Sequence, residues 1–115
     1  MSISNLVGLT DQLSKNTIEW EEARKALGMD EVALLKAKHE LKRMEAAFIV
    51  EQPIPGKNAA ERDAYLFDHF IAENTDVIDA EVSLRRARAL FERYDNERKT
   101  LSLLIRAEIA MATDE

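Results

Sequence analysis

Apolar residues recur at every seventh position through the first half of the chain. They are Leu13, Trp20, Leu27, Leu34, Leu41 and Phe48. Ala23, Ala37 and Met44 lie on an intermediate row, which also contains polar residues such as Asn16. Two rows repeating every seven residues are typical of a helix that packs along another helix. The pattern predicts a first helix over residues 11–51, after an irregular N-terminal arm at residues 1–10.

Gly28 interrupts this pattern chemically and is followed by Asp30, a residue that often begins a helix. The seven-residue phase nevertheless continues across the glycine. The sequence therefore leaves two alternatives open, a continuous first helix with or without a bend at Gly28, and two separate helices.

Residues 52–58 contain both prolines of the chain, Pro53 and Pro55. Residues that precede proline are disfavoured in the helical conformation, so the first helix is expected to end here in a turn. Asn58 and Glu61 have the spacing of a capping box, in which two side chains satisfy backbone N–H groups at a helix start. A short helix is predicted over residues 59–72.

No glycine or proline occurs from Asp76 to Ala112, and this segment predicts a long amphipathic helix over residues 76–112. Its two apolar rows are Val77, Leu84, Phe91 and Ile105, and Ala80, Ala87, Tyr94 and Leu101. Arg98 interrupts the first row. Leu90, Leu104 and Met111 flank the rows, so the apolar stripe is wider than one partner helix can cover.

The two long predicted helices have similar lengths and are joined by a turn and a short helix. We therefore expect a single all-α domain over residues 1–115, an antiparallel, coiled-coil-like helical hairpin with a short third helix at the turn. The wide stripe favours a homo-oligomer, because a second copy would cover the remaining apolar surface. The predicted oligomer interface comprises Trp20, Leu41, Phe48, Leu84, Phe91, Leu101 and Ile105.

Composition and charge limit the function. The 115 residues carry a formal net charge of −6, which gives no general attraction for nucleic acid. There is no cysteine, and His39 and His69 lack the sequence spacing of known metal motifs, so neither a metal nor a cofactor is expected. The N-terminal sequence lacks the features of a signal peptide, and no segment has the length and apolarity of a membrane span. We expect a cytoplasmic protein that is not an enzyme and has no catalytic residues.

A second hypothesis is an accessory protein that binds single-stranded DNA or RNA through Arg85, Arg86, Arg93 and Lys57. Arg85, Arg86, Arg88 and Arg93 form the most basic segment of the chain. Solvent-exposed arginines that pair with acidic residues, such as Glu81 with Arg85, would explain the same segment.

Lys57 and Arg62 lie at the predicted start of the short helix, where an anion or nucleotide could bind between subunits, a third hypothesis. A nucleotide-binding P-loop is excluded. Glu51 lies where its first glycine should be, and Asn58 follows the lysine.

Residues 18–41 resemble the helix-turn-helix of bacterial nucleoid and activator proteins. The residues that carry the resemblance are Ala23, Ala26, Leu27, Gly28, Met29, Asp30 and Leu34. Glu31 and Val32 stand where that family would contact bases, which weakens DNA recognition by this segment.

The turn GKNAAER at residues 56–62, with Leu66 and the helix after Thr75, resembles small, mostly uncharacterised helical proteins of tailed bacteriophages and prophages. The resemblance implies a phage origin, hence the host cytoplasm, and a non-enzymatic accessory role. Combined with the predicted oligomer, it favours a self-associating scaffold or adaptor, or a protein that binds a host or phage protein.

Overall fold

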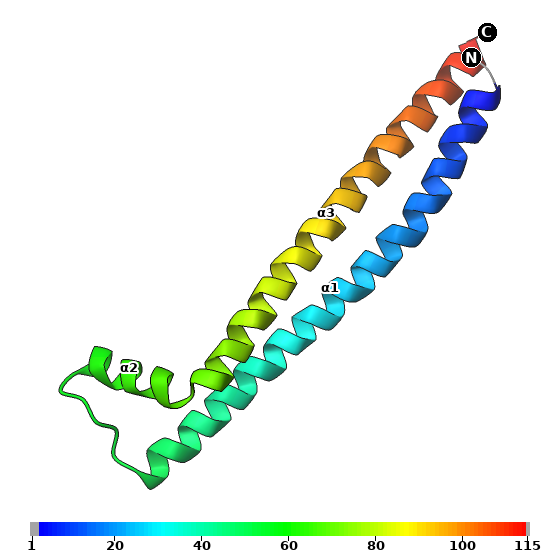
Figure 1. Cartoon of the computed structure of the whole chain (residues 1–115). Helices are drawn as coiled ribbons and strands as arrows, with labels where there is room; N and C mark the ends of the chain where they lie inside the picture. The colour runs from blue at the N-terminus through cyan, green and yellow to red at the C-terminus, as the bar shows by residue number, and fades with distance from the viewer. Residues whose placement is uncertain (1–2, 115) are drawn as a thin grey trace. The chain divides into compact units, whose positions relative to one another are not determined.

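The computed structural model describes residues 3–114 of the chain, and these form three α-helices and no strand. The helices are α1 (Ile3–Glu51), α2 (Ala59–His69) and α3 (Ile71–Asp114) (Figure 1). The long helices α1 and α3 pack against each other as an antiparallel hairpin with the short α2 between them in sequence. The predicted all-α fold class is confirmed.

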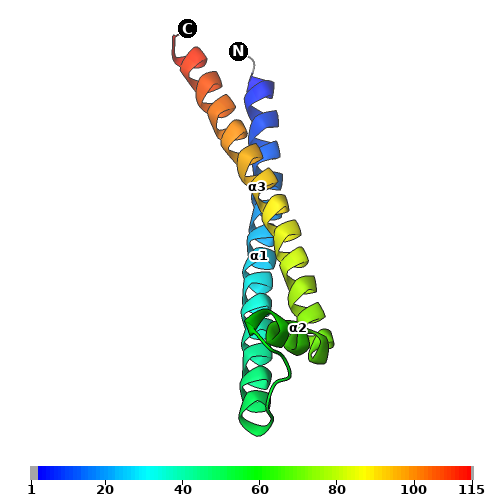
Figure 2. The ribbon, with the colours of Figure 1, turned by 90° about the vertical axis from the view of Figure 1, so that its left-hand side faces the viewer.

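The described chain divides into two compact units, each containing a segment of both long helices. The first unit comprises residues up to Gly28 together with those from Arg86 onwards, and the second comprises Met29–Arg85. The first residues of α1 and the last residues of α3 lie at the same end of the first unit (Figures 1 and 2). The single domain inferred from the sequence stays a prediction beside this division.

Helix α1 begins earlier than the sequence indicated. Residues 3–10 are helical rather than an irregular arm, and residues 1–2 lie outside the described part of the chain. Leu6 and Leu9 are half-buried and continue the rows of Leu13 and Asn16 by one more repeat. Packing on this extended stripe favours helix over the irregular conformation that a polar, glycine-containing segment suggests.

Gly28 does not break α1, which is helical without interruption from Ile3 to Glu51. A helix-turn-helix over residues 18–41 is therefore wrong, because that motif requires a turn between two helices. A single glycine costs a helix only about 1 kcal/mol relative to alanine, and packing on both sides of it offsets that amount.

The boundary between α2 and α3 also differs from the prediction. Phe70 alone separates the helices, so α2 ends before residue 72 and α3 begins before residue 76. Phe70 is only 7% exposed, and burial of its ring decides where the chain bends. Asn74, a residue type that often begins a helix, instead lies inside α3 and donates from Nδ2 to the Phe70 carbonyl oxygen at 3.0 Å.

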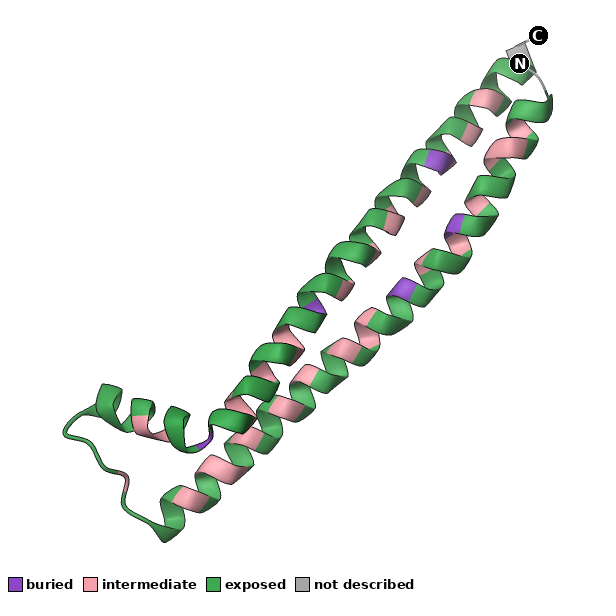
Figure 3. Ribbon diagram, in the orientation of Figure 1, coloured by how far each residue is buried: buried purple, intermediate pink, exposed green. Residues whose placement is uncertain are grey.

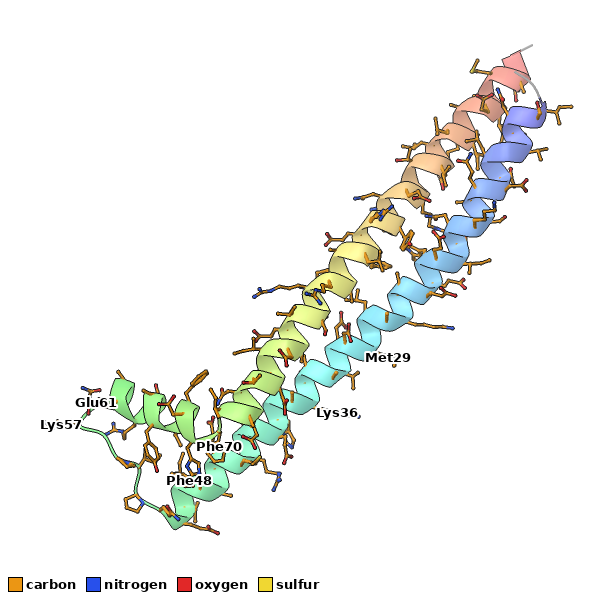
Figure 4. The ribbon with its side chains drawn as sticks, in the orientation of Figure 1. Met29, Lys36, Phe48, Lys57, Glu61 and Phe70 are labelled. Atoms are coloured by element: carbon orange, nitrogen blue, oxygen red, sulfur yellow. The ribbon has the colours of Figure 1, made fainter. Side chains whose placement is uncertain are left out.

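The turn before α2 lies where the prolines predicted it. Gly56 has a φ of 142°, and a Cβ there would lie 2.8 Å from the Arg62 backbone nitrogen, so only glycine fits. Asn58 caps α2 because its Oδ1 accepts from the Glu61 N–H at 2.9 Å. The Glu61 carboxylate accepts from the Lys57 N–H at 2.7 Å, one residue earlier than a capping box requires (Figure 4).

Burial follows the two predicted rows on each long helix (Figure 3). Within residues 3–114 few residues are buried, namely Asn16, Ala23, Phe70, Leu84 and Leu101. In the first unit, Thr17 contacts Arg98 while Trp20 contacts Phe91 and Asp95, so residue numbers rise along α1 as they fall along α3. The core of each unit is thus a narrow seam.

Candidate functional site

Polar side chains cross the seam of the first unit around Trp20. Trp20 Nε1 donates to Asp95 Oδ1 at 3.1 Å, and Arg98 Nη1 donates to Thr17 Oγ1 at 2.6 Å. Arg98 thus occupies a seam position without leaving its guanidinium group unsatisfied. The interruption of the apolar row at residue 98 is explained by this pairing with α1.

Asn16 lies among these polar side chains, which we call the polar layer of the first unit, and is 1% exposed. Its Nδ2 donates to the Tyr94 carbonyl oxygen at 3.0 Å and to Glu97 Oε1 at 3.3 Å. Both partners only accept, which fixes the orientation of the amide group. Its Oδ1 has no hydrogen-bond partner, an arrangement that costs about 1–3 kcal/mol. A buried asparagine in a helical seam lowers stability but favours one register of pairing.

The Trp20 ring is surrounded by cationic and aromatic groups. The guanidinium carbons of Arg98 and Arg24 lie 5.0 Å and 5.7 Å from its centroid, and the Phe91 centroid lies 5.8 Å away. Guanidinium groups at this range are attracted to the electron-rich face of an indole. These contacts restrict Trp20 and hold the half-buried Arg98 against its ring.

Asp95 connects the polar layer with the surface. Its Oδ2 lies 3.0 Å from Lys99 Nζ, and an acid four residues before a base is a favourable spacing for such a pair on a helix. The hydrogen bond from Lys99, and then that from Trp20, lower the pKa of the Asp95 carboxyl group. The carboxylate is therefore held in its charged form beside the indole.

A shallow hollow opens next to this layer. It is lined by Trp20, Asp95, Arg98, Lys99, Ser102, Leu103 and Arg106. Three cationic side chains face one carboxylate here, although the whole chain has a net charge of −6. The hollow can hold an acidic group chemically, and the exposed Leu103 provides apolar surface beside the charges.

The second unit is held together by aromatic rings instead. The Phe48 centroid lies 4.4 Å from that of His69, 5.6 Å from that of Phe70 and 6.3 Å from that of Tyr65. Phe48 comes from α1, and Phe70 joins α2 to α3 (Figure 4). Tyr65 and His69 belong to α2. This cluster, Phe48, Tyr65, His69 and Phe70, packs α2 against α1 within the second unit.

The residues predicted for an oligomer interface are partly covered within the chain itself. Leu84 and Leu101 are buried, and the remaining residues are half-buried: Trp20, Leu41, Phe48, Phe91 and Ile105. Trp20 and Phe91 contact each other within the first unit, and Phe48 contacts the aromatic cluster of the second. Their role between subunits stays a prediction.

The predicted cationic residues of α3 are divided between the two units. Arg85 belongs to the second unit, and Arg86, Arg88 and Arg93 belong to the first. All are exposed, and within residues 3–114 none forms an ion pair, including the expected pair of Arg85 with Glu81.

Lys57 and Arg62 are exposed at the start of α2. The Glu61 carboxylate already accepts the Lys57 N–H there, so a negative group of the chain occupies the place where an external anion would bind.

The sequence contains a signal that could have predicted the polar layer. Asn16 and Arg98 are the polar interruptions of otherwise apolar rows, and two such interruptions on facing helices can pair. Lys99 and Arg106 had no such signal, because exposed cations on a helix are common. Only the fold places them beside Trp20.

Within residues 3–114, no group of three or more histidine or acidic side chains is arranged to hold a metal ion. None of the described helices combines the length and apolarity needed to cross a membrane. Comparisons with protein families, curated proteins and solved structures found no match for this chain. The phage resemblance therefore stays a prediction.

Proposed function

We propose that this chain is a non-enzymatic, self-associating helical scaffold or adaptor. The observation that supports the proposal is the number of large apolar side chains left exposed beside a narrow seam. In the described part of the chain they include Val32, Leu35, Ile49, Ile71, Ile78, Leu90, Leu103, Leu104, Ile109 and Met111. Apolar surface of this extent on a two-helix seam is typical of an interaction protein.

The exposed side chains are organised rather than scattered. Leu90, Leu104 and Met111 share one heptad position on α3 and are 43%, 46% and 56% exposed. They are the residues that widened the apolar stripe in the sequence. Because α1 covers only the central rows of α3, this flank is available to another helix, most simply from a second copy.

The biological setting of the proposal comes from the phage resemblance. An accessory protein encoded by a phage would work in the host cytoplasm, where its free apolar flanks would bind another copy or a host or phage protein. Neither a cofactor nor a catalytic group is needed for this role.

The proposal is tested by light scattering after size exclusion, comparing the wild type with the triple variant L90Q/L104Q/M111Q. We expect the wild type to associate and the variant to have a lower mean mass with unchanged helix content. E92Q/N96Q/T100Q, at exposed polar positions of the same helix, is the matched control and should associate like the wild type. A wild type that remains monomeric at every concentration would contradict the proposal.

Nucleic-acid binding is a second candidate function, supported by the exposed Arg85, Arg86, Arg88 and Arg93, which form no ion pair within residues 3–114. Under this hypothesis R85A/R86A/R93A loses affinity for single-stranded DNA or RNA and keeps its helicity. A salt-independent affinity, or none in the wild type, would contradict it.

A further inference from the structure

The first turns of α3 form an acidic and apolar surface on the second unit. From Ile71 to Leu84 the charged residues are all acidic, namely Glu73, Asp76, Asp79 and Glu81. Asp76 and Asp79 are exposed, and within residues 3–114 neither forms an ion pair. Ile71 and Ile78 are 51% and 48% exposed on the same segment.

Helical spacing places Asp79 beside the apolar groups, and Asp76 lies one turn before Asp79. Ile71 and Ile78 lie seven residues apart, hence on one face, and Val82 follows Ile78 by four. Asp79 lies three residues before Val82, so its carboxylate flanks the apolar row. We call this segment, Ile71–Val82, the acidic stretch.

The hollow beside Trp20 has the opposite character. Between Arg98 and Arg106 every charged residue of α3 is cationic. Lys99, Leu103 and Arg106 follow one another at intervals of four and three, so an apolar side chain lies between two cations. Thr17 and Trp20 hold Arg98 in place, and their contacts therefore order one cationic side chain of the hollow.

We propose that the hollow beside Trp20 binds the acidic stretch of a second copy of this chain. Carboxylates of Asp76 and Asp79 would face Lys99 and Arg106, while Ile78 and Val82 would cover Leu103. This inference rests on the proposed self-association and names the surfaces that direct it. A contact between two different surfaces is heterologous, so it generates rings or extended assemblies unless two copies exchange it reciprocally.

Charge favours a protein segment over nucleic acid as the occupant. The hollow is lined by three cationic side chains and one carboxylate. Its excess of positive charge is sufficient to attract the acidic side chains of one protein segment. A polyphosphate strand would in addition meet the acidic surface of a chain with a net charge of −6. The acidic stretch combines the required negative charge with apolar side chains in one helical segment.

The test uses the full-length chain and exposed residues only. The variant K99E/R106E reverses the charge of the hollow, D76K/D79K reverses that of the acidic stretch, and a third variant combines all four substitutions. R86E/R93E is the matched control, because it makes the same change of net charge at exposed arginines of α3 outside the hollow. Sedimentation velocity gives the association constant, circular dichroism the helix content and the absorbance ratio at 260 and 280 nm any bound nucleic acid.

We expect each double reversal to weaken association by about tenfold or more, the fourfold variant to recover it, and R86E/R93E to associate like the wild type. If K99E/R106E associates as strongly as the wild type, this inference is overturned and the proposed scaffold function stays intact. An equal loss in R86E/R93E would also overturn it, since net charge alone would then be responsible. Nucleic acid bound to the wild type and lost in K99E/R106E would overturn it in favour of nucleic-acid binding, and a monomeric wild type would overturn both proposals.

Discussion

The two units use the same pair of helices but are held together by different chemistry. The first unit places Asn16, Trp20, Asp95 and Arg98 in its seam, where hydrogen bonds have defined partners. The second unit packs Phe48 against rings from α2 and from the bend at Phe70. Directional hydrogen bonds specify a register, whereas ring packing mainly contributes buried area. We infer that the aromatic cluster holds α2 in the second unit, and that the hydrogen bonds of the first unit fix how its own segments of α1 and α3 align.

The largest effect should come from truncating the aromatic cluster. Phe70→Ala removes a ring that is 7% exposed, and such changes typically cost about 3–5 kcal/mol in the free energy of unfolding. The chain contains one tryptophan, Trp20, whose fluorescence reports on the first unit alone. In Phe70→Ala we expect two separate transitions. Helix content should begin to fall at a lower denaturant concentration than the one at which Trp20 fluorescence changes. Phe67→Ala, at a 43% exposed ring, is the control, and an equal loss there would contradict the account.

Glycine substitutions should separate the turn from the helices. Gly56→Ala forces a positive φ and a close contact with Arg62, and we expect a cost of about 1–3 kcal/mol in thermal or chemical denaturation. Gly28→Ala, where a Cβ meets nothing within 4 Å, should instead stabilise α1 by about 0.5–1 kcal/mol. Equal signs for the two substitutions would show that the turn is not the constrained element.

Replacing the buried asparagine should raise stability and lower specificity. Asn16→Leu removes an acceptor without a partner, and we expect the free energy of unfolding to rise by about 1 kcal/mol. The register of the first unit should become less unique, which extra amide resonances of residues in that unit would reveal by NMR. A destabilised variant with one set of resonances would contradict the register role.

The smallest effect concerns protonation of Asp95. Its pKa is lowered in the folded chain by the hydrogen bond from Lys99 and then by that from Trp20. The stabilisation is therefore complete above the unfolded value of about 3.9 and is lost as the pH falls through the folded value. Lys99→Met should raise the pKa of Asp95 in a carboxyl NMR titration. The pKa of Glu40, lowered by a hydrogen bond from Arg43 in the second unit, should not change, and a shift there would contradict a local origin.

The seven-residue rows predicted both long helices and their packing, because a repeating apolar stripe has few other uses. The start of α1 and the bend at Phe70 were placed wrongly, since local signals at Gly8 and at Asn74 are weaker than packing of Leu6, Leu9 and Phe70. The hollow beside Trp20 was not predictable. It combines Trp20 of α1 with Lys99 and Arg106 of α3, and neither cation has a periodic signature.

The most direct test of the proposed scaffold is the mass of the wild-type chain in solution. Sedimentation velocity should be measured over a wide range of protein concentration at low and high salt. We predict a species heavier than the 13.1 kDa of one chain, whose mean mass rises with protein concentration. The association constant should fall at high salt, because charged surfaces direct the contact. A single 13.1 kDa species at every concentration and both salts would contradict the scaffold and its proposed contact together.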